Sequence, residues 1–523
     1  MTTPSKQSRA GTGKGIRAAT RVGAGIFVSR VLGFVRDRVF AHYFGSSDFA
    51  DVWRAALRLP NVIRNLLGEG TLSASMIPVY SEFVGKGEEE KAKRFAGAVL
   101  GLLAVVSGAI ALAGVLVAPL LVQAFFPKWT PEKQEITTTL VRILFPMSGI
   151  FVLAAWSMGV LDSHRRFFVS YVAPAFWNVA LIGVMVAGGM FWGLGQRDLV
   201  VVLAWGALAG GFVQLGIQAS AALKHLPGLR PSLDRNAPGV PEAIRNFVPV
   251  VAARGVVNLS GWFEIFLAGL LSSGSVAVMG YAQTFYILPI SLFGISIAAS
   301  ELPEMSQMRA EDRALLGERV ARALKRIAYF LIPAAVGYLL LGDVAIAALF
   351  ETGEFGETQT LVTWGVLGAF SLGLPATASS RALSSAFYAL RDTKTPARIA
   401  YVRVVVSLVV GVAAMIPLDE YGFSGLRLGA AGLALGASVA AWVEFALLRR
   451  KLGARIGPHG PGLAPVLRMT LAASVAGGVA VLLQFTAPDV STTVLALETL
   501  LPFGVVYLIV SSMLGEGISV RRS

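Results

Sequence analysis

The chain alternates between long apolar segments and short polar connections over most of its 523 residues. An α-helix needs about 20 predominantly apolar residues to cross a bilayer. Fourteen segments can be placed, near 15–43, 48–83, 95–126, 136–161, 168–194, 198–223, 243–272, 275–304, 319–350, 358–389, 398–418, 425–448, 464–486 and 491–514. The pattern therefore predicts an all-α polytopic membrane protein with fourteen transmembrane helices.

Basic residues gather in every second connection between these segments. This set includes the stretches 86–94, 165–166, 224–235 and 449–455, whereas the intervening connections, such as HYFGSS and ETGEFGE, are acidic or neutral. Cytoplasmic loops retain Lys and Arg. The alternation predicts that both termini lie in the cytoplasm.

Composition agrees with a membrane environment, since 55% of the residues are hydrophobic and only 15% are charged. The net charge of +14 follows mostly from the basic loops, so it does not indicate nucleic-acid binding. There is no cysteine, which excludes disulfides and thiolate sites, and the four scattered histidines suggest no metal cluster. We expect no cofactor and no cleaved signal peptide, because charges interrupt the first apolar segment.

Short motifs recur six segments apart. The motif RLP at 58–60, followed by MIPVYSE at 76–82, is similar to ILP at 287–289, followed by ELPEMSQ at 301–307. The motif GVLDSHRRF at 159–167 likewise corresponds in position to YALRDTKTP at 388–396. Because the motifs lie an even number of spans apart, the two repeats cross the membrane in the same direction. This predicts two six-helix lobes related by a parallel pseudo-two-fold axis. The expected divisions are a basic cytoplasmic N-terminus over 1–14, an N-lobe over 15–223, a cytoplasmic linker over 224–242, a C-lobe over 243–455 and two further helices over 464–514.

The second segment contains DVWRAALRLPNVIRNLLGEG at 51–70, which is unusually polar for a membrane helix. Its polar residues Asp51, Arg54, Arg58, Asn61 and Asn65 follow helical spacing and share one face, with Arg64 beside Asn61. Pro60 is expected to bend this helix, and Gly68 and Gly70 to interrupt it. A polar face of this kind belongs against a water-filled cavity. The alternative is that residues 15–83 lie as amphipathic helices in the membrane interface.

The first segment supplies Ser29, Arg30, Arg36, Asp37 and Arg38 within its apolar run. An arginine deep in the bilayer costs about 2.5–3.5 kcal/mol on insertion scales. Arg38 can reach an interface, whereas Arg30, Arg36 and Arg64 are too far from the helix ends and are expected to contact a ligand.

The acids in these two segments leave two interpretations open. Asp37 either neutralises a neighbouring arginine or contributes to the site, and Asp51 is either a structural partner of Arg54 or Arg58 or a functional residue. Guanidinium groups pair bidentately with phosphate oxygens. A cavity dominated by arginine therefore predicts a phosphate or diphosphate, such as the headgroup of an anionic lipid.

The segments SRVLGFVRD (29–37), LPNVIRNLLGEG (59–70), MIP (76–78) and YALRDTKTP (388–396) resemble the MurJ/MviN family of the multidrug/oligosaccharidyl-lipid/polysaccharide exporter superfamily. The resemblance implies a monomeric, multi-pass protein of the bacterial cytoplasmic membrane that is not an enzyme. It implies that alternating access moves lipid II, the undecaprenyl-diphosphate-linked muropeptide of cell-wall synthesis, to the outer leaflet, with 464–514 forming a groove for the lipid tail. By matching positions, the family's polar cavity residues fall on Ser29, Arg30, Arg36, Asp51, Asn61, Arg64 and Glu69.

The chain departs from the family pattern in segment eight. YAQTFYILPIS (281–291) places Gln283, Thr284 and Ile287 where family members carry charge, so the C-lobe is expected to be less basic. Glu264 in segment seven either binds a coupling cation or proton, or hydrogen-bonds to a neighbouring helix. The membrane potential is the other candidate driving force.

Two other functions remain open. One is export of another polyprenyl-diphosphate-linked saccharide, or of a drug, by a related transporter of the superfamily. The other is glycosyl transfer onto a polyprenyl phosphate. That enzyme would need a catalytic base or metal-binding carboxylates at the membrane surface, and the loops are mostly short and contain no Asp/Glu/His cluster.

Overall fold

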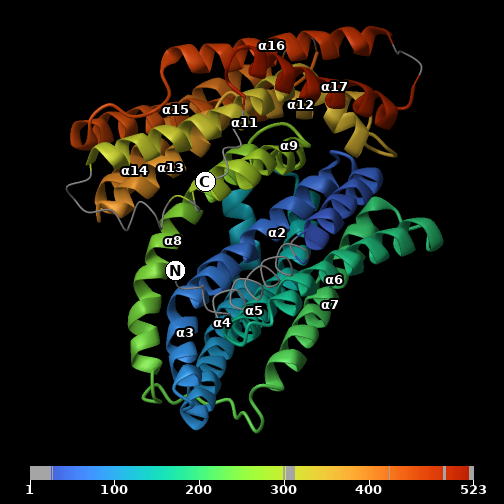
Figure 1. Cartoon of the computed structure of the whole chain (residues 1–523). Helices are drawn as coiled ribbons and strands as arrows, with labels where there is room; N and C mark the ends of the chain where they lie inside the picture. Colours follow the sequence, from blue (N-terminus) through green and yellow to red (C-terminus); the bar gives the residue numbers. More distant parts are fainter. Residues whose placement is uncertain are drawn as a thin grey trace. The chain divides into compact units, whose positions relative to one another are not determined.

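The structure is a computed structural model, and it describes residues 25, 27–298, 301, 313–422, 425–486 and 490–517. The basic N-terminus over 1–14 and the side chain of Glu69 lie outside the described residues. Nearly all described residues are helical, as the apolar pattern predicts (Figure 1).

The chain divides into two compact units. Unit 1 comprises the described residues up to Phe44 together with Asp48–Phe266, and unit 2 comprises Gly45–Ser47 and the chain from Leu267 onward. Unit 1 holds a helix over 27–44, then α2 (Asp48–Leu67), α3 (Glu69–Gly85), α4 (Glu89–Phe125), α5 (Pro131–Ser163), α6 (Phe167–Val186), η1 (Ala187–Phe191), α7 (Gln196–Leu223) and most of α8 (Val240–Gly269). Unit 2 holds α9 (Ser275–Pro289), η2 (Ile290–Ile295), α11 (Arg313–Phe350), α12 (Glu357–Ser371), α13 (Leu374–Ala389), α14 (Lys394–Glu420), α15 (Gly429–Ile456), α16 (Leu463–Thr486) and α17 (Thr492–Met513).

Helix α5 is the centre of unit 1. Helices α2, α3, α4 and α7 all pack against it, and 83% of its most apolar stretch is buried. It begins cleanly because the Thr130 side chain accepts a hydrogen bond from the Lys133 amide, with Pro131 in the first turn. Helix α2 packs along α5 and is part of this helix bundle.

Among the described residues, eleven helices are long and apolar enough to cross a membrane. They correspond to predicted segments three to six and eight to fourteen. The other three segments are the helix over 27–44, the pair α2 and α3, and α8, each of which carries charge within its length. The polar side chains of the predicted site all lie in these three segments.

The break between α2 and α3 depends on Gly68. Its backbone amide donates to the Arg64 carbonyl at 2.8 Å, which closes the last turn of α2. A Cβ atom at Gly68 would lie 2.2 Å from that same carbonyl oxygen, far inside van der Waals contact. Glycine therefore stands directly after the end of α2 at Leu67, where the sequence predicts an interruption.

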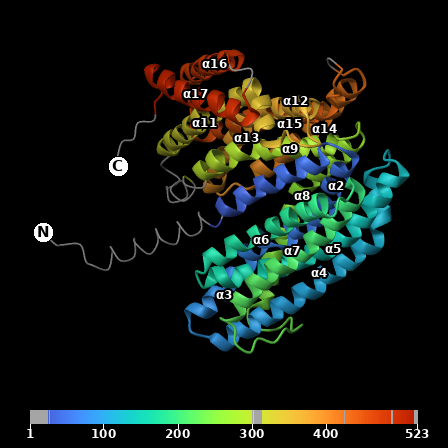
Figure 2. The same ribbon diagram turned by 90° about the vertical axis from the view of Figure 1, so that its right-hand side faces the viewer.

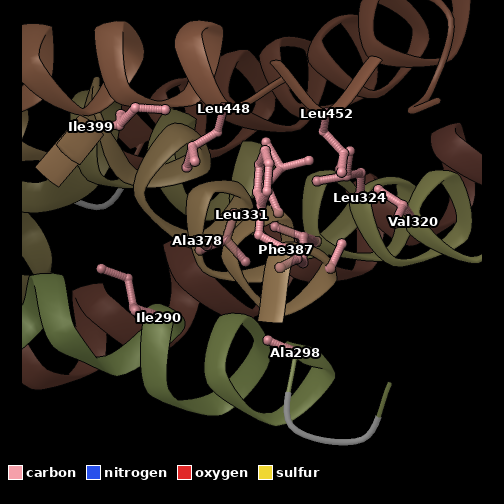
Figure 3. Close-up of a cluster of buried hydrophobic side chains, with 14 of the residues drawn as sticks. Ile290, Ala298, Val320, Leu324, Leu331, Ala378, Phe387, Ile399, Leu448 and Leu452 are labelled. Atoms are coloured by element: carbon pink, nitrogen blue, oxygen red, sulfur yellow. The ribbon is translucent and has the colours of Figure 1, made fainter. Parts of the chain in front are cut away.

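Unit 2 is built around α11 and α15. Figure 3 shows Leu331 and Phe387 in its core, with Leu448 and Leu452 from α15 beside them. Helices α16 and α17 pack on each other and on α11 (Figure 2). At this contact, Tyr507 donates a hydrogen bond to the Tyr329 carbonyl at 2.6 Å. Small residues on α16 allow this close approach: Ala472, Ala473 and Ala476 are buried there.

Candidate functional site

A cavity of about 220 Å³ lies inside unit 1, between the helix over 27–44 and helices α2, α5, α6 and α7. Its charged lining residues are Arg36, Arg54, Arg64 and Asp37, so three arginines face one acid. Its other lining residues are Phe40, Trp53, Leu57, Asn61, Met147, Phe151, Trp177, Leu181, Met185 and Leu203. The cavity therefore concentrates positive charge among aromatic and aliphatic side chains.

Each of the three arginines stacks on an aromatic ring. The Arg36 guanidinium carbon lies 5.4 Å from the centre of the Trp177 ring, and that of Arg54 lies 5.4 Å from the Phe40 ring. The third, Arg64, lies 4.6 Å from the Phe151 ring. A guanidinium held over a ring by a cation–π contact can still pair with a phosphate through its N–H groups, so the two contacts are compatible.

The aromatic partners are themselves held in place. The Trp177 indole donates a hydrogen bond to the Ala207 carbonyl of α7 at 3.0 Å, and its ring meets Phe151 edge-to-face at 5.9 Å. Phe40 stacks on Phe44 at 4.8 Å between ring centres. The arginines thus rest on a rigid aromatic lining, which reduces the entropy lost when they bind a ligand.

Arg36 is anchored by hydrogen bonds to two neighbouring side chains. It donates to Asp37 from Nε at 3.1 Å and from Nη2 at 2.8 Å, and to the Asn178 side-chain oxygen from Nη1 at 2.9 Å. Asp37 therefore neutralises Arg36, which is one of the two interpretations that the sequence left open. Arg54 and Arg64 provide the remaining positive charge of the cavity.

The cavity brings together three of the predicted site residues, Arg36, Asn61 and Arg64. Ser29 is not among the lining residues, but its carbonyl accepts a hydrogen bond at 3.4 Å from the side chain of Asn178, which also contacts Arg36. Arg30 is exposed on the same helix and is not among the lining residues.

Asp51 is found away from the cavity, in a buried ion pair. Lys133 of α5 donates to it at 2.8 Å, and the two side chains are 7% and 2% exposed, respectively. Lys133 also pairs with Asp48 at 2.6 Å and lies 4.2 Å from the centre of the Trp129 ring. This contact gives Asp51 a structural partner on another helix and fastens the start of α2 to α5.

The last two predicted residues lie elsewhere. Glu69 begins α3 directly after the Gly68 break, and Glu264 is half-buried on α8. Three lining or supporting residues, Arg54, Trp177 and Asn178, were not among the predicted site residues. Arg54 had a signal in the sequence, since it shares the polar face of α2, and Asn178 stands out as a lone amide within the apolar run FWNVAL.

The fold and its arginine-lined cavity together define a polytopic membrane transporter. Its architecture is shared with solved transporters of the MOP superfamily. One of them, titled an inward-facing multidrug resistance MATE family transporter, has a TM-score of 0.64 at 18% identity, covering 84% of this chain and 98% of that one. The structure titled "Lipid II flippase MurJ, inward closed conformation" gives a TM-score of 0.75 at 24% identity, covering 94% of this chain and 98% of that chain.

Sequence comparison identifies the family within that class. The family model "Lipid II flippase MurJ" matches residues 40–501. The "Probable lipid II flippase MurJ" of Rhizobium meliloti (strain 1021) is 30% identical over 471 residues, which cover 88% of this chain and 85% of that protein. A relative of the same name from Vibrio cholerae is 30% identical, covering 84% of this chain and 82% of its own length. The chain belongs to the lipid II flippase MurJ family and is a multi-pass protein of the bacterial inner membrane.

Proposed function

We propose that this protein carries lipid II from the inner to the outer leaflet of the cytoplasmic membrane. Family membership supports the substrate, since the relatives are named as lipid II flippases. The observation that carries the proposal is the cavity in unit 1, where three arginines on aromatic supports face one acid. Such a cavity suits a diphosphate, which accepts paired N–H donors from more than one guanidinium.

In the proposed mechanism, the diphosphate of the headgroup pairs with Arg36, Arg54 and Arg64, while Asn61 supplies a neutral contact. Ser29 and Arg30 precede Arg36 on the same helix and complete the set of headgroup contacts. Asp51 acts indirectly, by holding α2 against α5 through Lys133. Glu69, immediately after Gly68, is the last of the proposed substrate-binding residues. The proposed transport involves no covalent chemistry.

The proposed topology has fourteen spans with both termini in the cytoplasm. It adds the helix over 27–44, the α2–α3 pair and α8 to the eleven apolar helices. The linker over 224–242 lies in the cytoplasm in this topology, which the basic residues in its sequence support. In this scheme, lobes over 15–223 and 243–455 alternate between inward-open and outward-open states as a monomer, and the lipid tail follows a groove formed by 464–514.

The membrane potential is the proposed driving force. Outward movement of an anion from a negative interior is favoured by about 2.3 kcal/mol per charge per 100 mV. Outward transfer of the diphosphate is therefore favourable without a bound coupling ion. Glu264 is the candidate for cation or proton coupling if the potential alone is insufficient.

The test is depletion with rescue in a bacterium whose own flippase can be switched off. Lipid II exposed on the outer leaflet is measured after expression of the wild type or of Arg36→Ala, Arg54→Ala or Arg64→Ala. We expect the wild type to restore exposure and each variant to restore much less. Arg197→Ala is the matched control, because Arg197 forms an exposed ion pair with Glu132 at 2.7 Å, outside the cavity.

The rescue experiment also separates the competing functions. A wild type that reaches the membrane but does not expose lipid II would exclude this substrate and favour export of a different lipid-linked saccharide. Cavity variants that restore exposure as well as Arg197→Ala does would exclude the arginine mechanism while leaving the substrate in place.

A further inference from the structure

A second cavity of unit 1, of about 320 Å³, lies between the end of α2, α3, α4 and the start of α8. Its size is within the range of pockets that bind small molecules. Eleven of its thirteen lining residues are hydrophobic, and the other two are Ser75 and Arg235. It shares no lining residue with the arginine-lined cavity, so it is a separate site.

The interior of this second cavity is suited to a hydrocarbon chain. Its polar residue there, Ser75, already donates its hydroxyl to the Thr71 carbonyl at 2.8 Å within α3. At the opening, Val106 of α4 and Ile244 of α8 are 46% and 42% exposed, so the rim is apolar as well. A hydrated solute would lose its hydrogen bonds to water on entering, whereas an apolar chain would not.

The depth of the cavity along α4 corresponds to one leaflet of a bilayer. Arg94 is the last charged residue of this helix. The lining residues Val99 and Val106 follow it by five and twelve residues, which at 1.5 Å per residue is about 8 Å and about 18 Å. Half of the hydrocarbon core of a bilayer is about 15 Å thick. The cavity therefore runs from below the headgroup region to the middle of the membrane.

The connection between α7 and α8 covers the polar end of the cavity. The Ser232 amide donates to the Gly97 carbonyl of α4 at 3.0 Å. A Cβ atom at Gly101, one turn further along α4, would lie 2.1 Å from the Ser232 carbonyl oxygen. Only glycine allows the connection to lie this close to α4. These contacts hold the backbone that leads to Arg235.

Arg235 supplies a positive charge at this polar end. It lines the cavity and is also exposed, so its guanidinium is accessible from outside. The neighbouring acid, Asp234, pairs with Arg94 at 3.8 Å, and Arg235 has no ion-pair partner within the described ranges of the chain. A guanidinium at the end of an apolar cavity matches a phosphate that is joined to a hydrocarbon chain.

We propose that this cavity binds one membrane phospholipid, with an acyl chain between α3, α4 and α8 and the phosphate paired with Arg235. A cavity that ends near the middle of the bilayer has the depth of an acyl chain, whereas an undecaprenyl chain is considerably longer. The site goes beyond the proposed function, because it involves neither the cavity arginines nor the transported headgroup. The bound lipid joins the start of α8 to α3 and α4 and therefore stabilises unit 1.

The test uses the purified full-length protein, freed of lipid and titrated by native mass spectrometry. One ligand is dioleoyl phosphatidylethanolamine, whose zwitterionic headgroup limits general attraction to the basic loops, and the other is dioleoylglycerol, which has the same chains but no phosphate. Arg235→Ala should weaken phosphatidylethanolamine binding about tenfold, with partial recovery in Arg235→Lys, and should leave dioleoylglycerol binding unchanged. Lys224→Ala is the matched control, because it removes an exposed positive charge from the same connection outside the cavity.

A second variant blocks the chain instead of the phosphate. Val106→Trp places a large ring at the opening and should reduce the binding of both ligands more than tenfold. Val105→Trp is its control, since Val105 is the preceding residue of α4, is 55% exposed and does not line the cavity. Both positions are exposed, so both variants should unfold at the wild-type temperature without lipid. Added phosphatidylethanolamine should raise that temperature in Val105→Trp but not in Val106→Trp.

Three results would overturn the proposal. The first is an Arg235→Ala protein that binds phosphatidylethanolamine as tightly as Lys224→Ala does, and the second is a Val106→Trp protein that binds it as tightly as Val105→Trp does. The third is displacement of bound phosphatidylethanolamine by an equal amount of undecaprenyl diphosphate, which would assign the cavity to the tail of the substrate. None of these measurements requires transport. A wild type that binds phosphatidylethanolamine through Arg235 but does not expose lipid II would contradict the proposed function alone.

Discussion

Asp51 and Lys133 form a buried ion pair at 2.8 Å that joins the first turn of α2 to the first turn of α5. Both side chains are almost fully enclosed, and Asp48 contacts the same ammonium group at 2.6 Å. The pair holds α2, which carries two of the cavity arginines, against the central helix of unit 1. The prediction from family resemblance that Asp51 contacts substrate can therefore be tested against a structural role.

Lys133→Met should destabilise the protein strongly, because it leaves a buried carboxylate without its main partner. Breaking a buried pair from one side typically costs about 3–5 kcal/mol, whereas replacing both charges is often nearly neutral. Asp51→Asn should cost less, since Lys133 keeps Asp48. The double variant Asp51→Asn/Lys133→Met should recover most of the lost thermal stability and also the export of lipid II. A stable but inactive double variant would instead indicate that Asp51 contacts the substrate.

Asn178 should be required for high affinity although it does not itself line the cavity. Its side-chain oxygen fixes the Arg36 guanidinium at 2.9 Å, and a hydrogen bond to a charged group contributes about 1.5–3 kcal/mol. Asn178→Ala should weaken the binding of undecaprenyl diphosphate about tenfold, as measured by titration in nanodiscs. The control is Asn236→Ala, at an exposed position in the connection between α7 and α8. Equal affinities for the two variants would show that Asp37 alone orients Arg36.

Gly68→Ala should disturb the end of α2 and with it Arg64. The added methyl carbon would lie 2.2 Å from the Arg64 carbonyl oxygen, and a backbone atom cannot move aside without shifting the last turn. We expect a lower unfolding temperature in scanning fluorimetry and a larger loss of lipid II exposure than stability alone explains. Gly216→Ala is the control, because nothing lies within 4 Å of a Cβ there and alanine favours the helix by about 0.5–1 kcal/mol. A Gly68→Ala protein that matches this control would show that the break does not position Arg64.

Apolar periodicity was sufficient to predict most of the helices but not the partners of their polar side chains. The eleven apolar helices appear where the sequence places them, and the polar face of α2 does carry Asn61 and Arg64 into one cavity. Helical spacing shows which residues share a face, but it does not show which helix that face meets. The contacts of Asp51 with Lys133 and of Arg36 with Asn178 join distant segments, so spacing could not reveal them.

The ion pair between Arg403 and Glu444 in unit 2 was missed for a different reason. The expectation of a weakly basic C-lobe was drawn from segment eight alone, where Gln283 and Thr284 replace charge. Arg403 and Glu444 were visible in segments eleven and twelve, but only the packing of α14 against α15 brings them together at 2.8 Å.

The predicted internal repeat gains support from two turns. Arg165 and Arg391, which follow α5 and α13, have φ angles of 57° and 58° and are the non-glycine residues with positive φ in the described part of the chain. Each donates its amide to the carbonyl three residues earlier, and the next amide in each turn bonds five residues back. The motifs around 159–167 and 388–396 were paired from the sequence, and their backbones form the same left-handed turn.

A stacked histidine pair at the end of α5 and α7 should make unit 1 sensitive to acid. The rings of His164 and His225 lie 4.3 Å apart and nearly parallel, and His164 Nε2 lies 3.0 Å from the Tyr80 hydroxyl. Burial lowers the pKa of His164 below its usual value, and the charges of His225 and Arg166 lower it further. The pKa of His225 is lowered by burial and then by Arg166.

Because the folded protein holds both rings neutral, the unfolded chain binds more protons below the ordinary histidine pKa of about 6.5. Stability should therefore be constant above about pH 7 and should fall as the pH drops from there through the lowered pKa values of the folded state. His164→Gln and His225→Gln should each flatten the decline in unfolding temperature between about pH 7 and pH 5, whereas His42→Gln should leave it unchanged. If all three variants retain the wild-type slope, carboxylates elsewhere cause the acid sensitivity and the stacked pair does not.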